Sequence, residues 1–397
     1  MTAKSIKGNG KEDISGALME SMIDGFKPTL AIVFLSVKQD RAAVGEMLDE
    51  EGIDVMKQHW PELQALLSKH GIATFGATTS GGFTDQGMVD AAIAMLLLDI
   101  DPNHFKIIFK EHESHSPFQS AAEIAEMGHS RFSNPAFIIL ATLIKTPAGD
   151  LVAGFIQKDE TNATVIGGMA GDPISLEGTI FTDKRSSENG IVCLVLDQDK
   201  IEVKGIAISG WKSLGTEKKV TRSEGLWVHT IDDLPAMDVV EKYTGNITLD
   251  RNDPNNVVKL NSTFPLQVNR QGSSPAMIPT LFLNKQNRAV MCGQPLAEGT
   301  TFRFSLPPDF DVIDKVVAST RTLKENNLPE VDAMLVFSCI GRLETLGPMM
   351  SEELEGLAAT WKKPMAGFFS LGEFGSVEGG NPEFHGTTCS WVALKEK

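Results

Sequence analysis

Apolar runs of strand length alternate along the chain with amphipathic segments of helical period. The run "TLAIVFLSV" at 29–37 is continuous and rich in branched residues, which is typical of a strand buried on both faces. Amphipathic helices are predicted at 61–71, beginning at Pro61, and at 116–128, where a capping box opens the helix and Gly128 would end it. The alternation predicts an α/β (mixed α+β) protein in which mixed β-sheets are flanked by helices.

A pattern of buried strand, glycine-rich turn and second buried strand occurs three times. Its copies are "LAIVFLS", "GATTSGG" and "AAIAMLLLD", then "AFIILAT", "GGMAGD" and "GIVCLVLD", then "AMLVFSC", "GFFSLGE" and "TTCSWVAL". Between first strand and turn, the chain is helix-like in the first and third copies and mostly hairpin-like in the second. Chance similarity among apolar runs leaves true duplication open, but the turns at 76–82, 167–172 and 367–373 lie at equivalent strand ends. If the strands share a sheet, these flexible turns converge on one crevice.

The length of 397 residues exceeds the size at which a single core keeps growing, so two domains are expected. The best boundary lies within 220–245, where strand-like runs give way to Asp232, Asp233 and Pro235. The predicted division is an N-terminal extension at 1–28, a first domain at 29–231 and a second domain at 232–397. The two domains are expected to be interleaved or closely packed.

Composition and charge argue against several classes of protein. Hydrophobic residues make up 42% of the chain and charged residues 22%, which is ordinary globular composition. The formal net charge of −16, without a long run of Lys or Arg, argues against nucleic acid or an anionic membrane as partner. No segment predicts a signal peptide, and the longest apolar stretch, 91–98, is too short to span a bilayer. The four cysteines are widely separated and are expected to be reduced thiols in the cytoplasm.

The ordered series "GGMAGD", "NGIVCLVLD", "VTRSEGLWVHTIDDLPAMDVVEKY", "FSCIGR" and "GFFSLGEFG…FHGTTCSWVAL" resembles the FIST family, named for F-box and intracellular signal transduction. The resemblance covers about residues 29–394 and implies paired FIST N-terminal and C-terminal domains. It also implies a bacterial sensory module that binds small molecules, amino acids among them, beside kinases, chemotaxis receptors or cyclic-dinucleotide enzymes. No kinase, cyclase-like or F-box segment fits within the first 28 residues, so the output is expected to act in trans on a signalling protein such as a histidine kinase or chemoreceptor.

Two charged residues near the third turn suit the two ends of an amino acid. Arg342 in "FSCIGR" follows a buried strand, and its guanidinium offers two parallel donors to a carboxylate. Glu373 in "LGE" is placed to receive an ammonium group, while backbone amides of the turns bind the remaining oxygens. An equally weighted alternative is an internal Arg342–Glu373 salt bridge that only joins two strand ends.

Hydroxyl groups, a thiol and glycines complete the predicted ligand site. Hydroxyls of the first turn, beside free amides, can hold an anion or a sugar-like hydroxyl, although Thr and Ser more often satisfy the turn backbone. The turn "GGMAGD" lacks the spacing and the lysine of a phosphate loop, so nucleotide binding is not expected. Cys339 lies near a guanidinium that would activate it, but a buried thiol at a strand end is more often inert packing. The expected ligand-binding residues are Thr78, Thr79, Ser80, Gly168, Asp172, Ser338, Cys339, Arg342, Gly372, Glu373 and His385.

Two further functions compete with metabolite sensing. Some FIST members resemble haem-based nitric oxide sensors, and His129 and His229 are the candidate haem ligands in this chain. Catalysis predicts a nucleophile with its base, paired carboxylates or a metal cluster, and the sequence contains no strong local signature of these. We therefore expect a sensor of a small polar metabolite that uses no cofactor and is not an enzyme, with hydrolase or transferase activity as a minor alternative.

Overall fold

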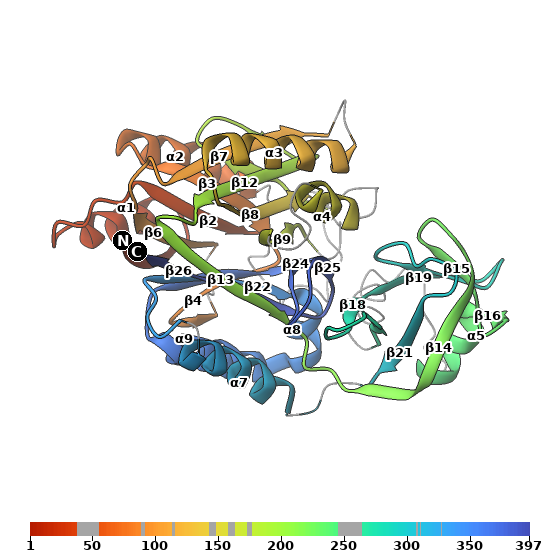
Figure 1. Cartoon of the computed structure of the whole chain (residues 1–397). Helices are drawn as coiled ribbons and strands as arrows, with labels where there is room; N and C mark the ends of the chain where they lie inside the picture. The colour runs from red at the N-terminus through yellow and green to blue at the C-terminus, as the bar shows by residue number, and fades with distance from the viewer. Residues whose placement is uncertain are drawn as a thin grey trace.

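The computed structural model describes residues 1–37, 55–88, 92–112, 116–142, 148–157, 163–172, 177–244, 264–306, 309, 311–326 and 328–397. These residues form three six-stranded sheets in a main body and one eight-stranded sheet in a smaller inserted domain (Figure 1). Helices flank the sheets of the main body, so the predicted α/β class is confirmed. Within the described ranges, no helix is long and apolar enough to cross a membrane.

The main body consists of three successive units with the same order of elements: strand, helix, strand, helix, strand, hairpin and strand. Unit 1 contains β1 (Thr2–Gly8), α1 (Lys11–Ser21), β2 (Leu30–Ser36), α2 (Val55–Lys69), β3 (Ala73–Thr79), β4 (Gly82–Thr84), β5 (Gly87–Met88) and β6 (Ile93–Asp99). Unit 2 contains β7 (Phe105–Glu111), α3 (Pro117–Arg131), β8 (Pro135–Thr142), α4 (Gly149–Ile156), β9 (Thr164–Ala170), β10 (Ile180–Thr182), β11 (Ser186–Ser187) and β12 (Gly190–Asp197). Unit 3 contains β13 (Ile201–Ile208), α7 (Asp311–Asn326), β22 (Ala333–Cys339), α8 (Ile340–Leu346), η2 (Gly347–Met349), α9 (Met350–Trp361), β23 (Met365–Ser370), β24 (Glu373–Ser376), β25 (Pro382–His385) and β26 (Cys389–Glu396). The predicted threefold repeat of strand, glycine-rich turn and strand is confirmed as a structural repeat.

Each unit contributes its hairpin to the sheet of another unit. β4 of unit 1 pairs with β23 of unit 3, β10 of unit 2 pairs with β3 of unit 1, and β24 of unit 3 pairs with β9 of unit 2. These pairings are antiparallel, whereas the two central strands of each unit, such as β2 and β3, run parallel. The glycine-rich turns therefore come together although their strands lie in three sheets, so the shared sheet on which the predicted convergence was conditional is not required.

The start of α2 and the presence of α4 differ from what the sequence predicted. α2 begins at Val55 instead of Pro61, which lies inside the helix. The neighbouring Trp60 is buried against Phe181, with ring centroids 4.1 Å apart, so tertiary packing outweighs the local preference of proline for a helix start. In unit 2 the segment before the turn, predicted to be hairpin-like, contains the helix α4, whose apolar residues pack onto the sheet.

α3 has the predicted capping box at Ser116 and Gln119 but continues beyond the predicted end. It ends at Arg131, and Gly128 lies within the helix on its buried face. A Cβ atom at Gly128 would come within 2.5 Å of the Phe137 ring. This glycine therefore allows the helix to pack closely on the sheet and does not end the helix.

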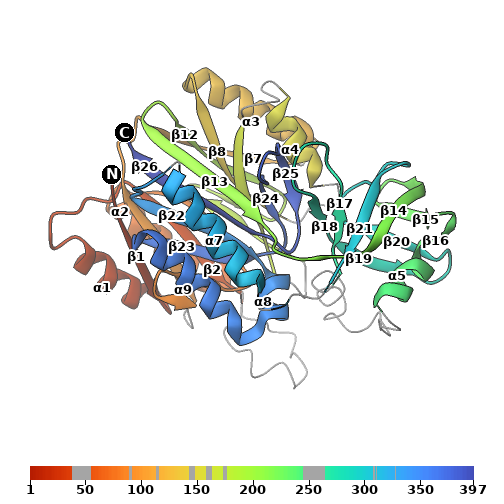
Figure 2. The same ribbon diagram turned by 60° about the horizontal axis from the view of Figure 1, so that its bottom comes forward.

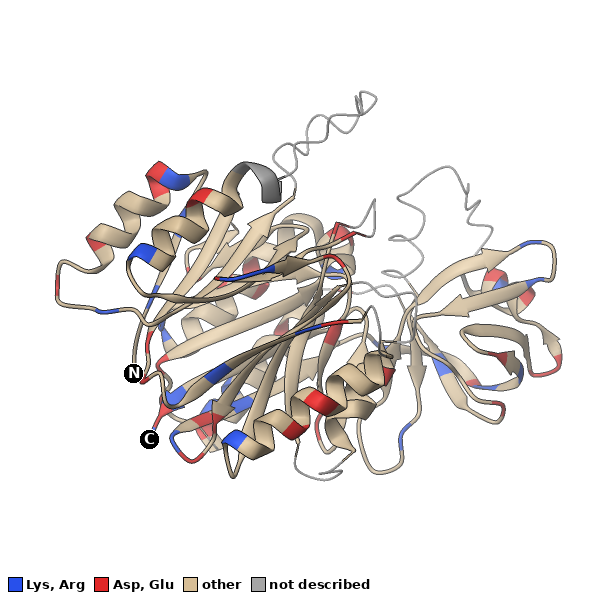
Figure 3. Cartoon of the chain, turned by 90° about the horizontal axis from the view of Figure 1, so that it is seen from above, with Lys and Arg blue, Asp and Glu red and all other residues tan. Residues whose placement is uncertain are grey.

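The three sheets of the main body enclose a central core, and helices cover their outer faces (Figure 2). Leu30, Ile138 and Leu335 are buried side chains of this core, one from each unit. α1 and α2 pack on the first sheet, α3 and α4 on the second, and α7 and α9 on the third. Charged residues are frequent on helices, loops and outer strands, whereas the central strands β2, β3, β8, β9, β22 and β23 carry none (Figure 3).

The inserted domain interrupts unit 3 between β13 and α7. It contains β14 (Ser213–Glu224), β15 (Trp227–Ile231), β16 (Leu234–Pro235), α5 (Ala236–Thr244), β17 (Leu266–Val268), β18 (Ala276–Ile278), β19 (Thr280–Asn284), β20 (Ala289–Cys292) and β21 (Thr301–Ser305). Phe302 and Phe304 belong to an apolar core of its own. The boundary predicted between residues 231 and 232 lies at the end of β15, and the predicted extension at 1–28 contains β1 and α1.

Candidate functional site

The central core changes from apolar to polar where the central strands of the three units end. Alternate residues of these strands point into the core, as Ile32 and Phe34 do on β2, so the next inward position is the last residue of the strand. These last residues are paired in register: Ser36 with Thr79, Thr142 with Ala170, and Cys339 with Ser370. We call the polar members of this group, together with Glu373, the polar cap: Ser36, Thr79, Thr142, Cys339, Ser370 and Glu373. All are buried, and Ser36 is the most exposed at 5%.

The three glycine-rich turns meet beside the polar cap. The contacts join each pair of turns: Ser80 Oγ donates to the Gly171 carbonyl at 2.7 Å, the Leu371 N–H donates to the Met169 carbonyl at 3.1 Å, and the Phe369 N–H donates to the Gly81 carbonyl at 2.9 Å. The convergence that the sequence predicted for these turns is thus present in the structure. It follows from the exchange of hairpins, because each hairpin leads directly from its turn into the next sheet.

Glu373 is the first residue of β24 and is fully buried. One carboxyl oxygen accepts a hydrogen bond from Ser370 Oγ at 2.6 Å, and the other accepts from Thr388 Oγ1 at 2.8 Å and from the Thr388 N–H at 3.2 Å. Burial raises the pKa of Glu373 to about 8, although the hydrogen bonds from Ser370 and Thr388 partly oppose that rise. In the described part of the chain, this carboxyl forms no salt bridge. A buried carboxyl of raised pKa where three turns meet is a strong candidate for a functional group.

Arg342, on α8, is also fully buried, and its guanidinium is paired with the carboxylate of Glu353. Its Nε donates to Glu353 Oε1 at 3.2 Å, and its Nη2 donates to the other oxygen of the same carboxylate. Its Nη1 donates to the carbonyls of Ser209 at 2.6 Å and Thr387 at 3.2 Å. The guanidinium also lies 5.0 Å from the ring of Trp211. The alternative of an internal salt bridge between Arg342 and Glu373 is therefore wrong, because the guanidinium pairs with Glu353 of α9.

Strand alternation separates Ser338 from its neighbour Cys339. Cys339 points into the central core, whereas Ser338 and its cross-strand neighbour Cys389 face the side on which Glu353 lies. Ser338 Oγ is buried and has no hydrogen-bond partner among the described residues. The structure thus places Ser338 and Arg342 on the opposite face of this sheet from the polar cap.

The three hydroxyls of the first turn satisfy backbone groups. Thr78 Oγ1 accepts from a backbone N–H of unit 2 at 2.8 Å, Ser80 Oγ donates to the Gly171 carbonyl, and Thr79 Oγ1 donates to a carbonyl of β2 at 3.4 Å. The half-buried Asp172 donates its own N–H to the carbonyl of Glu177 at 2.8 Å. Thr78, Ser80 and Asp172 therefore lie at the junction of units 1 and 2, next to the polar cap to which Thr79 belongs.

Gly168 and Gly372 permit the close approach of strands around Glu373. Gly168 is paired with Glu373, and a Cβ atom there would come within 3.1 Å of the Ser370 Cβ. A Cβ atom at Gly372 would come within 2.4 Å of ring carbons of Phe384. Both positions therefore lack a side chain because neighbouring atoms already fill the space.

Replacement of Gly372 by alanine should destabilise the protein by about 1–3 kcal/mol, because the added methyl group must displace the buried Phe384 ring. Thermal unfolding of the full chain measures the effect. The matched control is Gly16→Ala on α1, where no atom lies within 4 Å of the new Cβ and a small gain in stability is expected. Equal melting temperatures for Gly372→Ala and the wild type would contradict this account of the turn.

His385 lies opposite Glu373 in the β24–β25 hairpin and is fully buried. One ring nitrogen, Nε2, lies 3.2 Å from the Gly375 carbonyl, and the Met277 N–H of the inserted domain donates to the other, Nδ1, at 3.5 Å. Burial lowers the pKa of His385 to about 4, so the ring is neutral at pH 7. Because Nδ1 accepts a hydrogen bond, the proton of the neutral ring lies on Nε2. The structure therefore places His385 at the contact with the inserted domain.

Cys339 is a buried thiol, and burial raises its pKa with a further contribution from Glu373. The nearby Arg342 opposes that rise only weakly. All four cysteines are free and buried. The geometry fits a packed thiol better than an activated nucleophile, since activation requires a lowered pKa.

The two candidate haem ligands lie in different parts of the molecule. His129 is in the last turn of α3, with its ring 6.0 Å from that of Phe137. His229 is on β15 of the inserted domain, 18% exposed and 4.0 Å from Glu224. Neither ring belongs to the polar cap, and the two do not form a common site. Among the described residues, no group of three or more His, Cys, Asp or Glu side chains is placed to hold a metal ion.

Four residues around the polar cap were missed by the sequence analysis: Ser36, Thr142, Ser370 and Thr388. A signal was present, because the three first strands, "LAIVFLS", "AFIILAT" and "AMLVFSC", are mainly apolar and all end in Ser, Thr or Cys. Comparing the ends of the three copies would have aligned Ser36, Thr142 and Cys339. Thr388 carries no comparable signal, because its contact with Glu373 depends on how the two loops fold.

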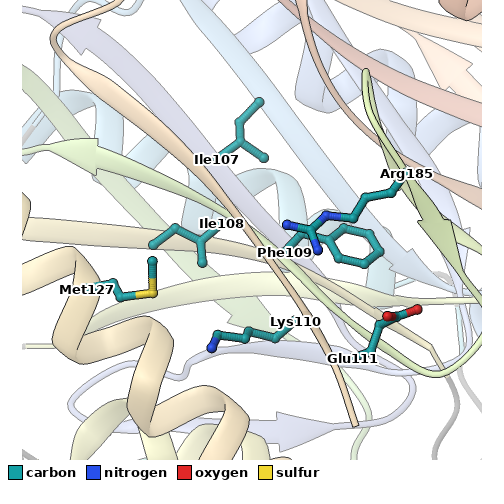
Figure 4. Close-up of a pocket in the computed structure, with 7 residues that line it drawn as sticks. All are labelled: Ile107, Ile108, Phe109, Lys110, Glu111, Met127 and Arg185. Atoms are coloured by element: carbon teal, nitrogen blue, oxygen red, sulfur yellow. The ribbon is translucent and has the colours of Figure 1, made fainter. Parts of the chain in front are cut away.

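A separate hollow of about 350 Å³ lies along β7, between α3 and the β10–β11 hairpin (Figure 4). The Arg185 guanidinium covers the Phe109 ring at 5.0 Å, and Met127 of α3 closes another side. None of the residues predicted to bind ligand lines this hollow. It is a surface feature distinct from the polar cap.

Comparisons with known proteins identify two domain families along the chain. The FIST N domain matches residues 29–234, and the FIST C domain matches residues 236–376. Among solved structures, that of cyanuric acid hydrolase from A. caulinodans has a TM-score of 0.34 and 9% identity, with 99% of each chain covered. A likeness of that size carries no inference about activity. The search of curated proteins found no match.

Proposed function

Because this chain belongs to the FIST family, we propose that it is a cytoplasmic sensory protein that binds a small polar metabolite at the polar cap. FIST domains are associated with sensing in signal transduction. The metabolite carries an amine, as an amino acid does, and its ammonium group pairs with the Glu373 carboxylate. Its remaining oxygens bind backbone N–H groups of the turns.

The observation that carries this proposal is the burial of Glu373 without a salt bridge in the described part of the chain. Burial raises the pKa of this carboxyl to about 8, so it is mostly protonated at neutral pH without ligand, and a bound ammonium group would stabilise its ionised form. Arg342 does not take part, because its donors are held by Glu353 and by two backbone carbonyls. The ligand carboxylate, if present, must therefore be bound by amides instead of by a guanidinium.

The β24–β25 hairpin supplies a route from the polar cap to the inserted domain. Glu373 lies on one strand of the hairpin, and Glu383 and His385 lie on the other. Arg270 of the inserted domain pairs with Glu383 through two hydrogen bonds of 2.6 and 2.8 Å. Ligand binding that moves β24 therefore changes the placement of the inserted domain and the surface it presents.

The partner that binds this surface of the inserted domain is a signalling protein acting in trans, such as a histidine kinase or a chemoreceptor. The net charge of −16 disfavours nucleic acid and anionic membranes as partners. Small-angle scattering with and without a bound amino acid tests the proposed movement. A profile that is unchanged at saturation would contradict a change in domain placement.

Isothermal titration of the full chain with a panel of amino acids and amines tests the ligand class. Glu373→Gln should weaken the binding of the active compound at least tenfold, which corresponds to about 1.4 kcal/mol of lost ion-pair energy. Glu378→Gln is the matched control, because Glu378 is an exposed residue of the same hairpin region. Unchanged affinity in Glu373→Gln would remove this carboxyl from the ligand site.

The haem alternative and the enzyme alternative have separate tests. A Soret band after purification with added haem, lost in His129→Ala or His229→Ala, would favour a haem-based nitric oxide sensor. Turnover of small esters or phosphates would favour an enzyme. Neither result is expected if the polar cap binds an amine.

A further inference from the structure

The inserted domain carries a polar hollow of about 700 Å³ on the face of its sheet opposite its apolar core. The alternation of residues along the strands explains this division. Phe302 and Phe304 of β21 point into the core, so Thr301 and Arg303 point to the other face. Gln267 of β17 is the cross-strand partner of Arg303 and lines the same hollow.

Among the charged side chains that line the hollow, Glu217 and Arg270 have partners, but Arg303 has none in the described part of the chain. Gln267, which is 7% exposed, donates its amide N–H groups to the Trp211 carbonyl at 3.1 Å and to Ser305 Oγ at 3.0 Å. The Arg303 side chain is exposed and makes no hydrogen bond or ion pair with the residues that the structure describes. The N–H donors of its guanidinium are therefore available to a ligand, and they lie beside the buried side-chain amide of Gln267.

A second guanidinium borders the same hollow. Arg270 lines it while pairing with Glu383 of β25 through two hydrogen bonds, at 2.6 and 2.8 Å. Glu217, the carboxylate among the described lining residues, accepts a hydrogen bond from the Asn269 side chain at 2.7 Å. Glu383 and Glu217 thus balance the two guanidinium groups in number, but Glu383 pairs with Arg270 and Glu217 bonds to Asn269. An anionic ligand would supply the partner that the Arg303 guanidinium lacks.

We propose that this hollow binds a small molecule bearing a carboxylate or phosphate group, held by Arg303 and Arg270. Both anions match the planar fork of a guanidinium and form charge-assisted hydrogen bonds with it. The volume of about 700 Å³ is in the range of small-molecule sites, so a metabolite fits better than a single ion. This site is separate from the polar cap and does not depend on the function proposed for that cap.

Binding at this hollow is linked to the main body through Arg270. An anion competes with the Glu383 carboxylate for the same guanidinium, and Glu383 is on β25 of the hairpin that carries Glu373. β18 of the inserted domain also contacts the hairpin, because the Gly386 N–H donates to the Met277 carbonyl at 2.9 Å (Figure 2). Occupancy of the hollow therefore loosens one of the contacts that hold the inserted domain on the hairpin.

Titration of the full chain with inorganic phosphate and with glutarate, at constant ionic strength, tests the site. Saturable binding of at least one probe is expected, and Arg303→Gln should weaken it at least tenfold. Arg222→Gln, on the exposed surface of β14 in the same domain, is the matched control and should bind as the wild type does. A response to phosphate alone or to glutarate alone identifies the group that is recognised. No saturable binding of either probe, or equal affinity in Arg303→Gln, overturns the proposal.

A second variant tests the part played by Arg270 without removing it. Glu383→Gln releases Arg270 from its carboxylate partner and should tighten binding of the same probe several-fold. Hydrogen exchange gives an independent readout, because the bound anion should protect backbone amides in β17 and β21 of the wild type but not of Arg303→Gln. Unchanged affinity in Glu383→Gln would overturn the assignment of Arg270 and its link to the hairpin.

Discussion

Glu353→Ala should lower the free energy of unfolding by about 3–5 kcal/mol, because it leaves the buried guanidinium of Arg342 without its carboxylate. Both side chains are fully buried, so water cannot replace the lost partner. The remaining hydrogen bonds of Arg342 go to neutral carbonyls, which compensate only part of a buried charge. Chemical denaturation of the full chain measures the loss.

The neighbouring residue Glu352 supplies the control. It lies on the same helix but is exposed, so Glu352→Ala should change stability by less than about 0.5 kcal/mol. The double variant Arg342→Met, Glu353→Leu removes both charges and should recover part of the stability lost in Glu353→Ala. If Glu353→Ala and Glu352→Ala are equally mild, the buried ion pair does not stabilise the fold as we infer.

Glu373→Gln should stabilise the protein increasingly as the pH rises from 4.5 to about 8. In that range the folded protein keeps the proton of Glu373, whose pKa is raised to about 8, while the unfolded chain has lost it near its ordinary pKa of 4.5. The folded state therefore binds more protons, and the free energy of unfolding of the wild type falls with rising pH. The glutamine introduced by the substitution has no ionisable group, so the difference should grow by up to about 1.4 kcal/mol per pH unit.

Urea unfolding at a series of pH values measures this difference. Below pH 4.5, Glu373 is protonated in both states of the wild type, so the two proteins should differ little there in pH dependence. Glu378→Gln, in the exposed part of the same hairpin region, should follow the wild-type curve throughout. Parallel curves for Glu373→Gln and the wild type would show that Glu373 is ionised in the folded protein.

Local patterns in the sequence predicted the central strands and the turns between them. The continuous apolar runs at 29–37 and 190–197 became β2 and β12, because strands buried on both faces leave no position for a polar residue before their ends. The capping box that opens at Ser116 also formed, since it requires only residues within one turn of helix. Family membership followed from the order of the motifs and is confirmed by the matches at 29–234 and 236–376.

Features that depend on distant contacts could not be predicted in the same way. The exchange of hairpins is a choice of pairing partner between strands far apart in sequence, such as Gly168 and Glu373, and no local pattern encodes that choice. The partner of Arg342 was missed for a similar reason. Glu353 reaches it only because the chain turns sharply at Gly347, where φ is 54°, and brings α9 back against α8.

The shared hairpins bear on how the protein can be divided. A cut between β12 and β13 would separate β9 from β24 and β23 from β4, so each piece would be left with an unfinished sheet edge. Neither half supplies the missing strands for itself, yet the two halves together contain all of them. We therefore expect the separated pieces to aggregate alone and to reassemble when mixed, so that their reassembly could serve as a readout in a split-protein assay.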